Sequence, residues 1–294
     1  MPAELMNTKE VADYLRLKER KVYDLVAKRQ IPCTRASGKW LFPKPLVDAW
    51  LLEQVEGKSA ATGPAELPDI VAGSHDPLLD WAVRESRSEL AVLFDGSLSG
   101  LDRLARQGAL ACGLHVIDPE TDAYNVPLVQ TRLGQEPVVI LEWAWREQGL
   151  IVPPGNPLRI EGLADLRRIR FAARQREAGS HVLLAHLLRQ RGLASEPIAD
   201  EVATVRSETE VALAVREGRA DAGLGICAVA AQFGLDFVPL HRERYDLVVW
   251  RRAYFEPPLQ RLMAFTRTAA FEGRARQSAG YDVTGLGRVH FNGP

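Results

Sequence analysis

Hydrophobic positions recur with helical and strand-like periods along this chain, and the first pattern is a pair of short helices. Apolar residues cluster on one face of Asn7–Leu15 behind a capping asparagine, and Glu19–Lys28 repeats the helical pattern after a short connection. Ile31–Pro43 has two strand-like halves around a Ser-Gly turn and predicts a β-hairpin, and Leu46–Leu52 predicts a closing helix. Two short helices joined by a tight turn predict a helix-turn-helix, with the hairpin as its wing.

Residues 68–294 show short apolar runs, each followed by Gly, Ser or Pro and then by an amphipathic stretch. Strands that alternate with helices predict an α/β domain with mostly parallel strand pairing. The predicted strands include Ile70–Ala72, Leu90–Phe94, Val138–Leu141, Arg170–Ala173, Ala222–Ile226 and Leu247–Trp250.

A linker is predicted between these two regions, at residues 55–67. Residues 56–66 are rich in small and turn-forming residues and contain no aromatic or β-branched apolar ones, which is typical of flexible segments. The predicted domains are therefore 1–54 and 68–294.

The composition is that of an ordinary globular protein. Of the 294 residues, 46% are hydrophobic and 26% are charged, so neither wholesale disorder nor a fibrous repeat is expected. No apolar run approaches the ~18–20 residues that a membrane span needs, and the first residues lack the pattern of a signal peptide. The three cysteines lie far apart and exclude a disulfide framework. We therefore expect a cytoplasmic protein with no membrane partner.

The net charge of −1 is unevenly distributed. Residues 1–54 carry ten Lys and Arg against seven Asp and Glu, so they hold +3 and the remainder holds −4. A basic head on a mildly acidic body is typical of nucleic-acid binding, although a solvated basic face has the same composition. The side chains expected to contact double-stranded DNA lie on the second helix, just after it, and at the hairpin tip; they are Lys18, Arg20, Lys21, Tyr23, Lys28, Arg29, Arg35 and Lys39.

The head resembles the excisionase-type winged helix-turn-helix, a small member of the mercury-resistance-regulator DNA-binding superfamily. The resemblance rests on "MNTKEVADYL", "KVYDLVAKRQIPCTRASGKWLF" and "LVDAWL", and it implies DNA binding. One departure is Lys18, where family members usually have Ser, so the second helix loses an N-cap worth about 1 kcal/mol. A helical protein-interaction module is the alternative for this region.

Four predicted loops of the body place Ser or Gly directly before a helix. Loops at the carboxyl edge of a parallel sheet commonly bind ligands. Helix N-termini with added Ser hydroxyls suit an anion, although any one of these Ser residues could equally be a routine cap. The loops lie at Gly73–Pro77, Asp95–Gly100, Arg174–His181 and Val205–Glu208.

The body resembles the periplasmic substrate-binding proteins, and among them the molybdate-binding type that occurs inside cytoplasmic regulators and beside molybdopterin-biosynthesis modules. The stretches that carry the resemblance include "GSHDPLLD", "EQGLIVPPGNP" and "VREGRADAGLGICAVAAQFGLDFVPL". The resemblance implies a type II fold of two α/β lobes joined by two crossing strands, with the ligand between the lobes. Lobe one would comprise about 68–150 and 243–294, and lobe two about 151–242, with the chain crossing near Gly149–Pro153 and Pro239–Asp246.

The resemblance also implies ligand residues. Ser74 and one of Ser97 or Ser99 would bind an oxyanion from lobe one, and Gly179-Ser180 with the Ser207 region would bind it from lobe two. Two departures leave other anions open beside molybdate and tungstate: Gly223–Ile226 lacks the tyrosine ligand of the molybdate binders, and His181 replaces a small hydroxyl residue. Three further ligand-binding candidates are charged or titratable side chains of these loops, and they are His75, Arg174 and His181; Arg176 is a further basic residue of the third loop. Arginines can hold a carboxylate or sulfonate, or can be surface charge.

No enzyme is predicted, because the sequence has no nucleophile elbow, phosphate-binding loop or dinucleotide fingerprint. No cofactor and no metal site are expected. We predict a one-component transcriptional regulator that binds DNA as a homodimer and senses a small molecule, which we expect to be an anion. The alternative is an enzyme or carrier protein of molybdenum-cofactor metabolism.

Overall fold

The computed structural model describes residues 5–28, 30–36, 38–53, 67–193, 198 and 200–294. The chain divides into two compact units, Met1–Ala65 and Glu66–Pro294, and each is described by itself. The predicted linker at 55–67 lies, except for Leu67, outside the described residues. No helix of the described part is long and apolar enough to cross a membrane.

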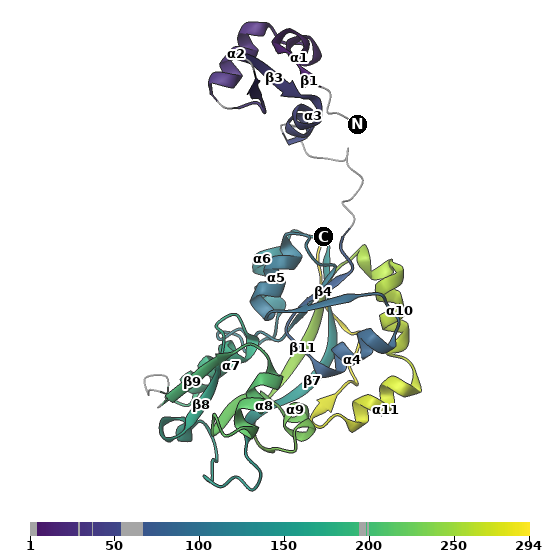
Figure 1. Ribbon diagram of the computed structural model, residues 1–294. Helices are drawn as coiled ribbons and strands as arrows, with labels where there is room; N and C mark the ends of the chain where they lie inside the picture. Colours follow the sequence, from purple (N-terminus) through teal and green to yellow (C-terminus); the bar gives the residue numbers. More distant parts are fainter. Residues whose placement is uncertain (1–4, 29, 37, 54–66, 194–197, 199) are drawn as a thin grey trace. The chain divides into compact units, whose positions relative to one another are not determined.

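The first unit contains the predicted helices and hairpin (Figure 1). Its three-stranded antiparallel sheet has the order β1-β3-β2, and the hairpin pairs Thr34 with Leu41. The closing helix begins two residues earlier than predicted. The elements are β1 (Leu5–Met6), α1 (Thr8–Tyr14), α2 (Glu19–Ala27), β2 (Thr34–Ala36), β3 (Lys39–Pro43) and α3 (Lys44–Glu53).

Local sequence explains how the two helices of this unit begin. The Asn7 side chain accepts hydrogen bonds from the amides of Lys9 and Glu10, and the Glu10 carboxylate accepts one from the Asn7 amide at 2.8 Å. This reciprocal capping box stabilises the start of α1. At α2 the N-cap is Lys18, which makes no side-chain capping bond, as its departure from the family pattern predicted. Packing compensates for the missing cap, because Val22 on the inner face of α2 is fully buried.

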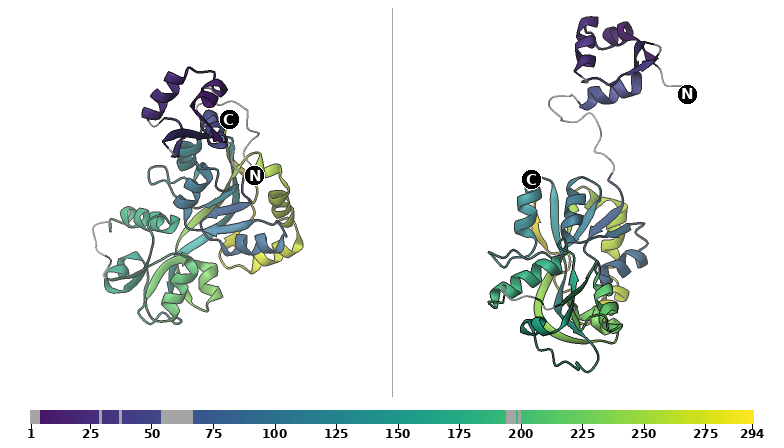
Figure 2. Two further views of the ribbon diagram at one scale, coloured as in Figure 1. Left: turned by 45° about the horizontal axis from the view of Figure 1, so that its top comes forward. Right: turned by 60° about the vertical axis from the view of Figure 1, so that its left-hand side comes forward.

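The second unit is a mixed α/β fold whose sheet has the order β5-β4-β6-β11-β7-β10-β8-β9, with β12 and β13 also paired to β7 (Figures 1 and 2). Its strands are β4 (Ile70–Gly73), β5 (Ala91–Phe94), β6 (Ala111–Leu114), β7 (Val138–Val152), β8 (Arg170–Arg174), β9 (Asp200–Val205), β10 (Ala222–Ile226), β11 (Asp236–Trp250), β12 (Tyr281–Asp282) and β13 (Val289–Asn292). Its helices are α4 (Pro77–Glu85), α5 (Ser97–Ala105), α6 (Val126–Leu133), α7 (Gly179–Gln190), α8 (Glu208–Arg216), α9 (Cys227–Gln232), α10 (Pro257–Phe265) and α11 (Ala269–Gln277), with 3-10 turns at Leu163–Arg168 and Ala253–Phe255.

Two 15-residue strands, β7 and β11, run antiparallel to each other and connect the two halves of the sheet. β11 pairs with β6 through Asp246–Val249, and β7 pairs with β10 through Gln148–Ile151. The first crossing therefore comes a few residues before the predicted Gly149–Pro153. The expectation of mostly parallel pairing was wrong for the centre of the sheet, because the returning strand must run against the outgoing one; only the flanks are parallel.

Each half of the sheet has its own hydrophobic core. We call the half built on β4, β5 and β6 lobe one; its core includes Leu79, Leu101 and Trp143. We call the half built on β8, β9 and β10 lobe two; its two clusters form on either side of these strands, around Phe171 and Val211. Because the lobes bury separate cores and share only the crossing strands, the loops between them are free to form a ligand site.

Candidate functional site

The basic side chains predicted to contact DNA are exposed on the first unit. Lys18, Arg20, Lys21 and Tyr23 are exposed at the start of α2, whereas Val22 and Val26 are buried, and Lys28 lies just after the helix. Arg35 and Lys39 are exposed on the two strands of the hairpin, with the Arg35 guanidinium 5.3 Å from the centre of the Trp40 ring. Arg29 lies outside the described residues.

The loop after β4 contributes three side chains with different partners. Ser74 is buried, and its hydroxyl lies 2.8 Å from Nε2 of His115. Asp76 caps α4 by accepting a hydrogen bond from the Leu79 amide at 2.7 Å. His75 packs edge-on against Phe94, and its Nδ1 atom is buried without a hydrogen-bond partner among the described residues. Burial lowers the pKa of His75, so its ring is neutral near pH 7.

Ser97 and Ser180 lie in the first turns of α5 and α7, one in each lobe. Both side chains are buried, and neither hydroxyl has a partner within the described part of the chain. The N-caps of these helices, Gly96 and Ala178, make no side-chain capping bond. Two helix starts therefore carry free hydroxyls and no protein acceptor, an arrangement that suits an anion.

The other predicted serines differ from these two. Ser207 caps α8 by accepting a hydrogen bond from the Glu210 amide at 3.1 Å, which is the routine capping role that sequence alone left open. Ser99 is half-buried in the first turn of α5.

Arg174, at the end of β8, is a buried cation. It is 7% exposed; its Nη2 donates to the Arg206 carbonyl at 3.0 Å, while Nε and Nη1 have no partner among the described residues. Burial lowers its pKa, and an arginine side chain remains charged even so. Arg176 is exposed. Arg174, Ser180 and His181 line a cavity of about 100 Å³ that is otherwise walled by apolar side chains of lobe two.

The loops of the two lobes touch one another around this region. The Gly96 amide donates to the Gly73 carbonyl at 3.0 Å, and the Leu98 amide donates across the lobes to the Glu177 carbonyl at 3.1 Å. Gly179 lies so close to His115 that a Cβ atom there would be 2.8 Å from the His115 carbonyl oxygen. The loops that carry Ser74, Ser97 and Ser180 are thus neighbours.

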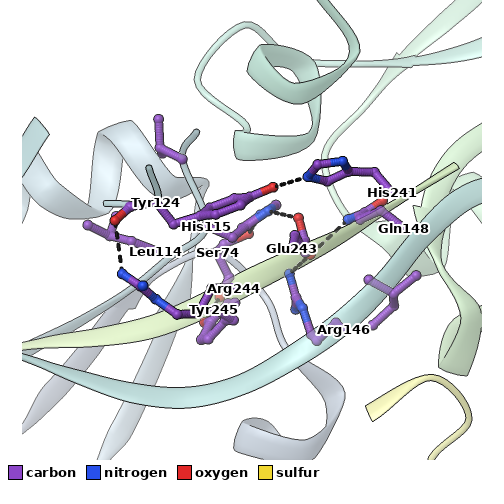
Figure 3. Close-up of polar contacts among 12 residues, drawn as sticks. Ser74, Leu114, His115, Tyr124, Arg146, Gln148, His241, Glu243, Arg244 and Tyr245 are labelled. Atoms are coloured by element: carbon purple, nitrogen blue, oxygen red, sulfur yellow. Dashed lines mark hydrogen bonds and ion pairs between the residues drawn. The ribbon is translucent and has the colours of Figure 1, made fainter. Parts of the chain in front are cut away.

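A buried polar network at the crossing strands was not predicted as part of the site. His115 Nδ1 lies 2.7 Å from Glu243 Oε2, and Glu243 also forms an ion pair with Arg146 and accepts from Gln148 Nε2 at 3.0 Å (Figure 3). Arg146 further pairs with Asp76 at 2.9 Å. The sequence feature that could have placed His115 in the site is that it directly follows a strand-like run, as Ser74 does.

Charge pairing decides the ionisation of this network. Burial opposes ionisation of Glu243, but the Arg146 guanidinium and His115 outweigh it and lower the pKa of Glu243 to about 2. Glu243 is therefore a carboxylate at neutral pH, and it accepts a hydrogen bond from the Nδ1–H group of His115. No group of three or more potential metal-ligating side chains was found among the described residues.

Comparison with known families identifies both units. A model of the PBP superfamily domain matches residues 81–267. The chain belongs to the PBP superfamily. A helix-turn-helix domain model matches residues 5–55, so this PBP-superfamily chain carries a helix-turn-helix domain at its N-terminal end, and the predicted fold class is confirmed.

Two proteins and two structures show how far the similarity extends. "Uncharacterized protein YvgK" of Bacillus subtilis is 27% identical over 95% of this chain and 96% of its own length. A protein from the 5' region of a 2Fe-2S ferredoxin gene of Clostridium pasteurianum is 31% identical over 28% of this chain and 74% of its own.

The structures share the fold of the second unit. A putative phosphate transporter substrate-binding protein from Clostridium perfringens with bound phosphate is 10% identical over 73% of this chain and 99% of its own, with a TM-score of 0.53. PhnD1 from Prochlorococcus marinus, in complex with methylphosphonate, is 12% identical over 74% of this chain and 92% of its own, with a TM-score of 0.50.

Proposed function

We propose that this protein is a transcriptional regulator in which the helix-turn-helix unit binds double-stranded DNA and the PBP-superfamily unit binds a small anion that changes DNA affinity. A DNA-binding role would place it in the cytoplasm. The observation that carries the proposal is that one chain joins an exposed basic helix α2 to two lobes whose facing loops hold buried donors. Among the described residues, the hydroxyls of Ser97 and Ser180 and the Nε and Nη1 atoms of Arg174 have no hydrogen-bond partner.

An anion fits these groups better than a neutral ligand does. The hydroxyls of Ser97 and Ser180 can donate, the helix starts behind them carry partial positive charge, and Arg174 adds a full positive charge. Buried donors without acceptors are costly, so a ligand that accepts from them binds favourably. Molybdate and tungstate remain candidates, and phosphate, phosphonates, sulfate, carboxylates and sulfonates belong in the same screen.

The direct test measures DNA binding with and without these anions. Fluorescence anisotropy of the full chain on the DNA upstream of its own gene should show binding that weakens steeply as salt rises, because phosphate contacts release counterions. One of the anions should change that affinity at constant ionic strength. Absence of binding at low salt would exclude the regulator and favour a role of the head in protein interaction.

Replacing Arg20 and Lys21 together by alanine should weaken specific DNA binding by ~1–3 kcal/mol for each side chain that contacts a base. Both side chains are exposed at the start of α2, where a recognition helix contacts base edges. The control is Arg106→Ala with Arg276→Ala, which removes the same charge from exposed sites of the second unit. Equal operator affinity of the two double variants would show that α2 does not bind the operator.

The regulator should be a homodimer. Helix-turn-helix proteins commonly gain affinity from two half-sites about one helical turn apart, and no long heptad pattern is available, so the second unit would supply the dimer contact. Light scattering of the full chain at micromolar concentration checks this. A monomeric mass together with one chain bound per operator would contradict it.

A further inference from the structure

A chain of hydrogen bonds connects the ligand loop of lobe one to the crossing strands. The Ser74 hydroxyl lies 2.8 Å from His115 Nε2, and His115 Nδ1 lies 2.7 Å from Glu243 (Figure 3). The Tyr245 hydroxyl donates to the Ser74 carbonyl at 2.5 Å and so fixes the backbone of Ser74. Because all three residues of the chain are almost fully buried, water cannot replace these bonds.

Proton counting limits what Ser74 can do. Glu243 is a carboxylate, so the Nδ1 of His115 carries a proton, and a neutral ring then presents Nε2 as an acceptor. The single hydroxyl proton of Ser74 is consequently donated to His115, and only lone pairs remain to face a ligand. An anion at Ser74 would meet those lone pairs and be repelled. If His115 also carries a proton on Nε2, it donates to Ser74, and the hydroxyl proton becomes available to the anion.

The charges of the buried network around His115 do not balance. Asp76, Glu243 and Glu208 supply three negative charges to the buried network, and Arg146 and Arg174 supply two positive charges, which leaves −1. An imidazolium would neutralise this balance, and an incoming anion would add further negative charge nearby. Buried charges are tolerated when they are paired, so anion and proton should bind together.

Several other titratable or charged groups lie near His115. From the elements packed against it they are Glu243 and Tyr245 of β11, Arg146 of β7, Asp76 at the start of α4, Glu208 at the start of α8, and Tyr124. Tyr124 is held by His241 at 2.9 Å. His75, Arg174 and His181 are the remaining groups of the site, and α7 approaches His115 with the Gly179 backbone. His75 and His181 are therefore the other histidines whose protonation the experiment must separate from that of His115.

We propose that His115 is a ligand-site residue that takes up one proton when a fully ionised anion binds. The protonated Nε2 then donates a hydrogen bond to the Ser74 hydroxyl, and that hydroxyl donates one to the anion. This rests on the proposed function, since it requires an anion between the lobes. The site thereby selects anions whose oxygens only accept hydrogen bonds, and it binds them more tightly as pH falls.

The experiment is titration calorimetry of the full chain with sulfate, molybdate, tungstate, methanesulfonate and acetate, each in two buffers of different ionisation enthalpy. At about pH 8, where a histidine is ordinarily neutral, the anion that binds should take up about one proton. Its affinity should fall about tenfold for each unit of rising pH near that value.

Two variants test the assignment to His115. In His115→Gln, the amide nitrogen can donate to Ser74 without titrating, so the anion should still bind and the proton uptake should disappear. Ser74→Ala breaks the relay with a smaller change and should also lose the uptake, with weaker binding. The matched control is His290→Gln, since His290 forms a similar 2.7 Å pair with Glu142 away from the loops; it should keep the uptake of the unmodified protein.

Other outcomes would contradict either the role of His115 or the proposed anion sensing. Binding without proton uptake at about pH 8 overturns the role of His115 and leaves anion sensing intact. Uptake that survives in His115→Gln and is lost in His75→Asn or His181→Asn does the same. No binding by any of the five anions overturns this inference; if phosphate and phosphonates also leave DNA affinity unchanged, anion sensing is overturned with it. Turnover of an activated ester that is lost in Ser74→Ala would show instead that Ser74, His115 and Glu243 act as a nucleophilic triad.

Discussion

Replacing Arg146 by alanine should destabilise the PBP-superfamily unit by about 3–5 kcal/mol. The side chain is fully buried, it forms ion pairs with Asp76 and Glu243, and its guanidinium lies 4.4 Å from the centre of the Tyr245 ring. Alanine would leave two buried carboxylates without a cation, which is the costly way to break a buried ion pair. Urea unfolding followed by tryptophan fluorescence checks this, because four of the six tryptophans lie in the second unit.

Arg242→Ala is the matched control for this change. Arg242 lies on the same strand pair, forms an ion pair with Asp282 and packs 5.2 Å from the Trp145 ring, but its side chain is 56% exposed. An exposed pair of this kind contributes less than about 1 kcal/mol. Equal losses of stability in the two variants would show that burial of the Arg146 network does not govern the stability of the unit.

The pH dependence of the same variants follows from Glu243. Its pKa in the folded protein is about 2, below the ordinary value of 4.5. A depressed carboxyl pKa stabilises the folded state above the ordinary value, and that contribution is lost as pH falls from about 4.5 to about 2. Arg146→Ala removes a main cause of the depression, so the stability difference between wild type and variant should shrink as the solution is acidified through this range.

The combined change Ser97→Ala and Ser180→Ala should abolish the thermal stabilisation produced by an anion. Ligand at 100 times its dissociation constant adds about 2.7 kcal/mol to the folded state, and the double variant should lose this contribution. Its melting temperature without ligand should hardly change, because neither hydroxyl has a protein partner among the described residues. Differential scanning fluorimetry with the anion panel measures both quantities.

Ser86→Ala combined with Ser278→Ala is the control for that pair. Both serines lie at helix ends of the second unit, and their hydroxyls donate to backbone carbonyls at 3.0 Å. This variant should melt slightly earlier and respond fully to the anion. If the Ser97 and Ser180 variant responds like the unmodified protein, the free hydroxyls do not contact the ligand.

The sequence by itself was sufficient for features that depend on neighbouring residues. The capping box at Asn7, the period of the apolar positions in α2 and the Ser-Gly turn of the hairpin act within a few residues, so the head could be predicted element by element. Six strands of the body were found, two of them only in part, and the Ser-bearing loops were found for the same reason; β6, β9, β12 and β13 were not among the predicted strands. The sequence could not tell a capping serine from a free one, since Ser207 and Ser97 precede or begin helices in similar ways.

Only the tertiary structure decided which polar groups share a buried space. His115 and Glu243 are 128 residues apart, and Asp76 and Arg146 are 70 apart. They meet because β11 returns antiparallel between β6 and β7, a pairing that no local pattern specifies. Inside the protein each charge must find its partner, and the partner is selected by strand register and not by distance along the chain. The chemistry of the site therefore depends on the two crossing strands, whose residues a sequence pattern identifies only as apolar runs.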